Sequence, residues 1–215
     1  EGEKGEKVIE KEIPADMFEK AKTWREKMVD RIAGEDSELT DKVLNGEVIS
    51  NEELVTVMRK ACLAFKLVPV FCGSALKNKG TQLVLDAVID YLPSPMDIGQ
   101  VKGIDLKTGA EIERKFSDSE PFSALVFKVA TDPFVGQLTF FRVYSGTLNK
   151  GTYLLNSITG EQERISRILR MKSNSREELD VIYAGEIGAT VGLKDTGTGN
   201  TLCDKDKPIV LEKIS

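Results

Sequence analysis

The sequence predicts a two-part α+β protein, with a helical and α/β first part followed by an antiparallel β-barrel. Apolar residues recur at three- or four-residue steps through about residue 63, which is typical of amphipathic helices. A short apolar run and a single helical stretch follow, as in half of a βαβ unit. From about residue 100 the apolar period falls to two and glycine-bearing turns separate short segments.

The bulk composition is that of a globular protein. The chain has 215 residues, of which 40% are hydrophobic and 30% are charged. It contains no apolar run long enough to cross a bilayer and no apolar signal-peptide core near its first residue. We therefore expect a cytoplasmic monomer with no membrane partner.

Histidine is absent and cysteine is sparse. The lack of histidine excludes Ser-His-Asp and Cys-His catalysis and histidine metal ligands. Cys62, Cys72 and Cys203 are far apart and form no CxxC pair, so we expect buried free thiols rather than a disulfide framework or a zinc site. We expect no catalytic residue and no metal ligand in this chain.

The net negative charge of the chain comes entirely from the first third of the sequence. Residues 1–63 hold 16 acidic and 11 basic side chains, whereas residues 64–215 hold 19 of each. The long-range positive field of a protein that binds nucleic acid by charge alone is therefore missing. Any RNA contact must use a local patch.

Residues 1–66 are predicted to form a helical subdomain. Pro14 opens a helix that ends near Gly34, and a second helix covers residues 37–44 with Gly46 after it. Ser50 and Glu53 form a capping box for a third helix. The expected inner faces are Met17, Ala21, Trp24, Met28 and Ile32 on the first helix, and Leu54, Val57, Met58 and Ala61 on the third.

Residues 67–99 are predicted to be strand, loop, helix and linker. The apolar run 67–72 reads as a buried strand, and the helix starts at Thr81 and stops before Pro93. A strand buried on both faces needs parallel neighbours that this sequence does not supply. We therefore expect the chain to be part of something larger, with a domain boundary near residue 100.

Residues 100–215 read as a barrel built from short strands. The expected β-segments are 122–129, 138–144, 152–156, 164–171 and 187–193. No helical pattern interrupts them, so a closed barrel or a sandwich is indicated, and the barrel is favoured.

Several ordered stretches carry a resemblance to a known family. They are GSALKNKG (73–80), LDAVIDYLPSP (85–95), PFSAL (121–125), ATDPFVG (130–136), RVYSG (142–146), GLKD (192–195) and TLCD (201–204). In this order and spacing the chain resembles bacterial elongation factor G, the GTP-driven ribosomal translocase, over about residues 12–211. The resemblance implies the end of a P-loop GTPase domain with its insert, followed by the β-barrel domain II.

The resemblance implies a guanine contact at Ser74, Ala75 and Leu76, where backbone N–H groups and the serine hydroxyl hold the guanine carbonyl. The alternative is an ordinary strand-to-helix turn made of small residues. No GxxxxGK[ST] loop and no Asn-Lys-x-Asp motif is present. GTP or GDP with magnesium is thus expected in a full-length parent, while this chain alone is expected neither to bind GTP tightly nor to hydrolyse it.

Basic residues of the barrel are candidates to contact small-subunit ribosomal RNA, a partner that the resemblance implies. Strand alternation predicts Arg164, Ser166, Arg170 and Lys172 on one face and Ile165, Leu169 and Met171 on the other. Such a face would contact phosphates. The alternative is a solvated face paired with Glu161, Glu163, Glu177 and Glu178. Arg142 is a further RNA candidate, or else one half of an ion pair at the barrel rim.

The acidic face of the first helix offers Glu19, Glu26 and Asp30. The resemblance implies that this insert meets the large-subunit stalk protein, and the alternative is a solvated helix face. Trp24 lies on the apolar stripe and is expected in the core.

The sequence therefore predicts a piece of a translation factor whose own activity is docking. The alternatives are a stand-alone barrel that binds RNA or protein, and a ribosome-recycling or ribosome-protection relative. An enzyme in its own right is opposed by the missing histidine and phosphate loop.

Overall fold

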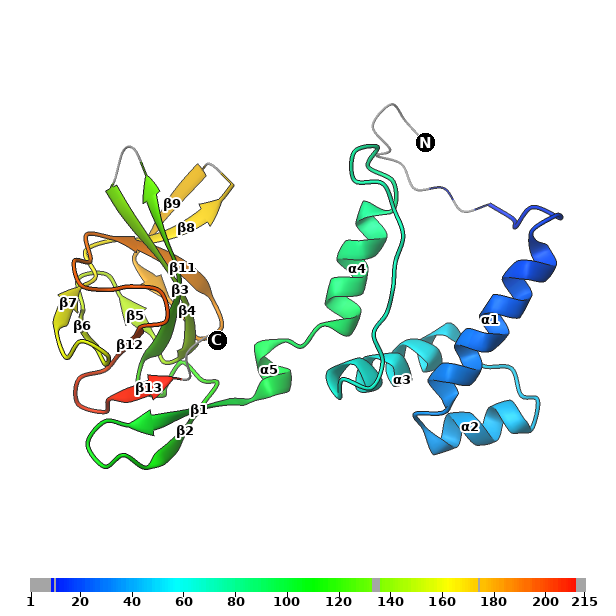
Figure 1. The fold of residues 1–215 in the computed structure, drawn as a ribbon, viewed down its shortest axis with the longest axis horizontal. Helices are drawn as coiled ribbons and strands as arrows, with labels where there is room; N and C mark the ends of the chain where they lie inside the picture. The colour runs from blue at the N-terminus through cyan, green and yellow to red at the C-terminus, as the bar shows by residue number, and fades with distance from the viewer. Residues whose placement is uncertain (1–8, 10, 133–135, 174, 212–215) are drawn as a thin grey trace. The chain divides into compact units, whose positions relative to one another are not determined.

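A computed structural model describes residues 9, 11–132, 136–173 and 175–211 (Figure 1). The chain divides into two compact units, Glu1–Pro93 and Ser94–Ser215. Residues 133–135, which belong to the ATDPFVG stretch, lie outside the described residues. No helix in the described part of the chain is both long enough and apolar enough to span a bilayer. The predicted separation of residues 1–66 from 67–99 stays a prediction.

The first unit contains four helices among its described residues: α1 (Phe18–Ala33), α2 (Ser37–Leu44), α3 (Asn51–Leu63) and α4 (Thr81–Tyr91). The capping box of α3 is confirmed, because Ser50 accepts from the Glu53 backbone and Glu53 accepts from the Ser50 backbone. The side chain of Lys42 donates to Glu53, and this bond together with the Ser50 bonds lowers the pKa of Glu53 to about 2. α3 therefore begins at the residue that the local sequence signals predict.

The core of the first unit lies where the last turns of α1 meet α2 and α3. Its buried members are Ile32, Ala33, Leu39, Leu54 and Val57. The prediction that Trp24 is a core residue is wrong, because its side chain is 63% exposed, and Met17 and Met28 are exposed too. An apolar stripe identifies a face of a helix, but it cannot say whether a partner covers that face.

The predicted strand 67–72 is wrong as an element of secondary structure. The segment is not paired with any other described segment, and Val68 and Val70 are exposed. A strand needs a neighbour for its backbone N–H and C=O groups, and the described residues supply none there. Cys72 is also exposed and Cys62 is half-buried, so only Cys203 fits the prediction of buried thiols.

The second unit begins with a helical turn and continues as β-structure. Its elements are α5 (Pro95–Ile98), β1 (Gln100–Asp105), β2 (Glu111–Lys115), β3 (Ser123–Asp132), β4 (Gly136–Ser145), β5 (Leu148–Asn149), β6 (Tyr153–Asn156), β7 (Gln162–Arg164), β8 (Ile168–Lys172), β9 (Ser175–Leu179), β10 (Val181–Ile182), β11 (Ile187–Val191), β12 (Thr201–Cys203) and β13 (Ile209–Leu211). Part of the predicted linker is thus ordered, because Ser94 and Asp97 cap α5 reciprocally. β1 then starts at Gln100.

The strands form the predicted antiparallel β-barrel (Figure 1). Its main sheet has the order β7-β6-β12-β3-β4-β11-β8-β9, and a smaller sheet has the order β13-β1-β2. Every strand pairing recorded among the described residues is antiparallel. The predicted α+β fold class with an antiparallel β-barrel is confirmed.

Alternation along the strands separates the inside of the barrel from the outside. Phe141 and Val143 of β4 point into the main core with Ile165, Ile168 and Leu202. On the outer face of the main sheet, Leu125 and Cys203 pack against Ile209 and Leu211 of β13. The small sheet therefore covers part of the outside of the barrel, and burial raises the pKa of the Cys203 thiol.

Candidate functional site

The predicted guanine loop is a tight turn between Gly73 and Gly80. Ser74 and Lys79 exchange backbone hydrogen bonds of 2.9 and 3.0 Å, and the Asn78 N–H donates to the Ala75 carbonyl. Within the part of the chain that the structure describes, no hydrogen bond is recorded from the backbone N–H of Ala75 or Leu76. Leu76 is 97% exposed at the tip. The turn therefore presents backbone donors to its surroundings, as a base-binding loop requires.

Close packing of backbone at the base of this turn explains its glycines. A Cβ on Gly73 would lie 2.7 Å from the Lys79 carbonyl oxygen, and Gly80 has a φ of +76°. Neither position accepts a larger residue without strain. The two glycines shape the loop, a role that sequence reasoning assigned only to small residues in general.

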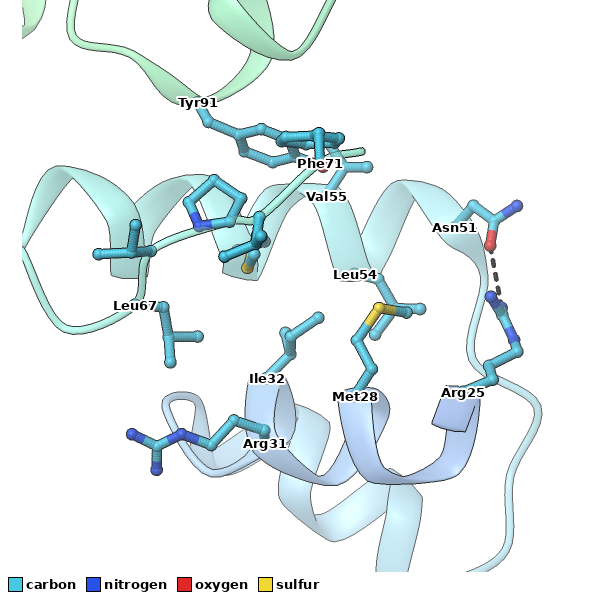
Figure 2. Close-up of a pocket in the computed structure, with 14 residues that line it drawn as sticks. Arg25, Met28, Arg31, Ile32, Asn51, Leu54, Val55, Leu67, Phe71 and Tyr91 are labelled. Atoms are coloured by element: carbon cyan, nitrogen blue, oxygen red, sulfur yellow. Dashed lines mark hydrogen bonds between the residues drawn. The ribbon is translucent and has the colours of Figure 1, made fainter. Parts of the chain in front are cut away.

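An apolar groove runs along the first unit beside residues 67–71 (Figure 2). It has a volume of about 460 Å³, and Ile32 and Met28 of α1 face Leu54 of α3 across it. Arg25 closes one end and donates to the Asn51 side chain at 3.0 Å. Most of the groove's lining is apolar, and its hydrogen-bonding side chains include Arg25, Arg31 and Asn51.

The predicted basic strand of residues 164–172 is interrupted in the structure. β7 ends at Arg164 and β8 starts at Ile168, and both Ile165 and Ile168 are fully buried. The backbone of Ile165 pairs with Gly151 and Thr152 instead of continuing along β8. Arg164 and Arg170 are therefore not on one strand, and the prediction of a single basic face is wrong.

Two of the four basic residues predicted to contact RNA form ion pairs with glutamate side chains. Arg170 donates to Glu186 at 2.6 Å, and Lys172 lies 2.9 Å from Glu177. Arg170 lies on the same side of β8 as the buried Ile168, because strand residues two apart share a face. These pairings match the alternative of a charge-paired strand face.

The other two candidates lie over tyrosine rings on the outside of the barrel. Arg142 is on the outer face of β4, with its guanidinium carbon 5.5 Å from the ring centre of Tyr144. Arg164 faces Tyr153 across β7 and β6, with 6.0 Å between guanidinium carbon and ring centre. Cation–π geometry orients both guanidinium groups along the surface.

Glu163 belongs to a buried network, although it was expected to be a surface counter-charge. It is 8% exposed and accepts from the Lys194 backbone at 2.6 Å and from the Thr196 hydroxyl. Asn156 extends the network, because its side-chain amide donates to Thr196 and to Asn200. These bonds fix the loop 192–200 against the β6–β7 hairpin.

Residues 121–205 match the family model described as elongation factor G domain 2. The matched residues run from just before β3 to just after β12 in the barrel unit. Its fold also resembles a crystal structure from Thermus thermophilus, with a TM-score of 0.69 and 26% sequence identity. That match covers 92% of this chain and 27% of the other, so this chain spans about a quarter of the length of that relative.

The matched residues include Arg142, Arg164, Arg170 and Lys172, whereas the other candidates lie in the first unit. Glu19, Glu26 and Asp30 are exposed on α1, as a docking face requires. Among the described residues no group of histidine, cysteine and acidic side chains could hold a metal ion.

Sequence reasoning missed Tyr153, which lies on β6 within the matched residues. The residue is 58% exposed and stands directly opposite Arg164. The signal was available in principle, because a tyrosine between the buried Leu154 and the turn at Gly151 must point outward in a strand. An exposed aromatic beside an arginine is typical of a binding surface.

Proposed function

We propose that this chain is part of a ribosomal translocase GTPase of the elongation factor G type, and that its own activity is docking on the ribosome. The match of residues 121–205 to elongation factor G domain 2 carries the proposal. GTP hydrolysis and tRNA–mRNA translocation then belong to the full-length parent.

The barrel is the proposed contact for small-subunit ribosomal RNA. Arg142 and Arg164 are the preferred contacts, because Arg170 and Lys172 already pair with acids. Arginine side chains on a strand surface position a protein on an RNA backbone without reading its sequence. The acidic face of α1, with Glu19, Glu26 and Asp30, is the proposed contact for the large-subunit stalk protein.

Co-sedimentation of the chain with bacterial ribosomes, across a salt series, tests this docking. We expect the chain to pellet with small subunits, and its affinity to fall as salt rises. The double variant Arg142→Glu with Arg164→Glu should bind roughly tenfold more weakly, since two phosphate contacts become repulsive. Ribosomes stripped of the stalk protein should bind less of the wild-type chain.

A matched control is Lys115→Glu with Lys205→Glu, which reverses two exposed charges elsewhere on the same unit. It should retain binding. Equal losses in both double variants would show that net charge alone drives the interaction, and no pelleting of a folded chain would refute docking.

We also propose that Ser74, Ala75 and Leu76 contact the guanine base of GTP or GDP, bound with magnesium, in the full-length parent. The turn geometry supports this, because backbone hydrogen bonds between Ser74 and Lys79 pin the loop, while no hydrogen bond from the N–H groups of Ala75 and Leu76 is recorded among the described residues. Small residues let backbone donors approach a base closely.

Replacing Ser74 with alanine in the full-length parent should weaken binding of a fluorescent GDP by about threefold to tenfold, the worth of one hydroxyl hydrogen bond. Lys77→Ala is the control, since Lys77 is exposed on the same turn. Unchanged affinity in Ser74→Ala would remove the serine hydroxyl from the guanine site.

A further inference from the structure

Tyr153 and Arg164 form an exposed aromatic–cationic pair at an edge of the main sheet. They are direct partners across the antiparallel strands β6 and β7. β7 is the last strand on its side of the main sheet, so within the described part of the chain no further strand of that sheet pairs with it there. One face of the Tyr153 ring carries the guanidinium of Arg164 and 58% of the residue is open to solvent.

The inward-facing neighbours fix this orientation. Leu154 is buried in the main core and Glu163 is buried in the polar network, and these two are also direct partners across β6 and β7. Because successive side chains of a strand point to opposite faces, Tyr153 and Arg164 must point outward. The pair is therefore held in place by the core beneath it and requires no ligand to form.

Further cations gather at the turn beside the pair. Gly151, with a φ of +88°, lets the turn close, and its N–H donates to the Ile165 carbonyl at 2.7 Å. This contact brings Lys150 next to the segment 164–167. Arg167 lies near enough to Lys150 and Glu178 to influence the pKa of both.

The acids at this turn offset only part of the positive charge. Lys150 binds Glu178 at 2.5 Å, and Asp180 is the other acid that acts on Lys150. Arg164 and Arg167 add two exposed cations, while the neighbouring acid Glu163 is buried in its own hydrogen-bond network. In a chain whose net charge is −5, such a patch suits a small local contact rather than a long phosphate-tracking groove.

We propose that the Tyr153–Arg164 pair binds an unpaired RNA nucleotide, with the base stacked on the tyrosine and the adjacent phosphates held by Arg164 and Arg167. This inference rests on the proposed ribosome docking and names the form of RNA that the barrel recognises. Unpaired bases stack on exposed aromatic rings and on arginine planes, whereas the bases of a duplex already stack on one another. The pair contributes little to folding at such an exposed site, so its side chains are available for binding.

Fluorescence anisotropy of a labelled single-stranded RNA of about ten nucleotides, against the same strand in a duplex, tests the proposal with the whole chain. We expect the single strand to bind more tightly than the duplex. Tyr153→Leu should weaken that binding by at least about fivefold, because one base loses its stacking partner. Tyr153→Phe should retain it, since the phenyl ring still stacks.

The control is Tyr183→Leu, which removes another exposed tyrosine of the same unit. Equal affinity of Tyr153→Leu and wild type for the single strand, a preference for the duplex, or an equal loss in Tyr183→Leu would each overturn the proposal. Ribosome co-sedimentation separates the proposed nucleotide site from the proposed docking on the ribosome. If Tyr153→Leu still pellets with small subunits like wild type, the nucleotide site is refuted while the docking function stands.

Discussion

Replacing Phe141 with alanine is expected to lower the free energy of unfolding of the barrel unit by about 3–5 kcal/mol. Phe141 is 1% exposed and lies in the main core, which strands from both sides of the barrel share. Removing the ring loses its burial and leaves a cavity that a closed barrel cannot readily fill. Urea unfolding of the chain, followed by circular dichroism of the β-signal, measures the change.

Phe140→Ala is the matched control, because Phe140 precedes Phe141 on β4 but lies half-buried on the other face. Phe140→Ala should lower the free energy of unfolding clearly less than Phe141→Ala, since the Phe140 ring is only half-buried. Equal effects of the two variants would mean that the side of β4 facing the core is wrongly assigned.

Replacing Glu163 with alanine is expected to lower the free energy of unfolding by about 2–4 kcal/mol, although the residue is charged and lies on a short edge strand. Its carboxylate accepts from the backbone N–H of Lys194 and from the hydroxyl of Thr196. Both donors lose their partner in the variant, and a buried donor without a partner carries its full desolvation cost. The loop 192–200 should also exchange its amide hydrogens faster, which hydrogen-exchange mass spectrometry would detect.

Glu161→Ala provides the comparison two residues away, where the side chain is exposed. Its effect on unfolding should stay within about 0.5 kcal/mol, as for ordinary surface substitutions. Faster exchange of residues 192–200 in Glu161→Ala as well would show that the loop is not held by Glu163.

Local sequence signals predicted the elements that depend only on nearby residues. The capping box at Ser50 and Glu53 and the asparagine-lysine-glycine turn at 149–151 each work through bonds within a few residues. The long strands β3 and β4 were likewise visible as alternating segments. Short strands such as β12 and β13 were missed, because three residues show no clear period and pairing with distant strands defines them.

The candidate site was predicted less completely than the fold. The resemblance pointed to residues 74–76, and strand alternation pointed to a basic face with Arg164, Arg170 and Lys172, yet the structure places Arg164 on β7 and the other two on β8. The sequence suggests one continuous strand over residues 164–171, but β7 ends at Arg164 and β8 begins at Ile168. The break follows from backbone hydrogen bonds of Ile165 with Gly151 and Thr152, which the sequence alone does not show. For the same reason the partnership of Tyr153 with Arg164 was not foreseen.

The sequence by itself determined the order of helical and β-rich parts, the starts of α2, α3 and α4 and the inside–outside alternation of the long strands, since each is set by residue spacing and local hydrogen bonding. The first helix was predicted to open at Pro14, but α1 begins at Phe18. Tertiary structure alone decided which charges are solvated. Glu163 is buried because Lys194 and Thr196, distant in sequence, bring it donors, and Arg170 is paired because the residue just before β11, Glu186, reaches it. It also decided that Trp24, Val68 and Val70 stay exposed. Burial requires a partner surface, and no pattern within a single segment contains that information.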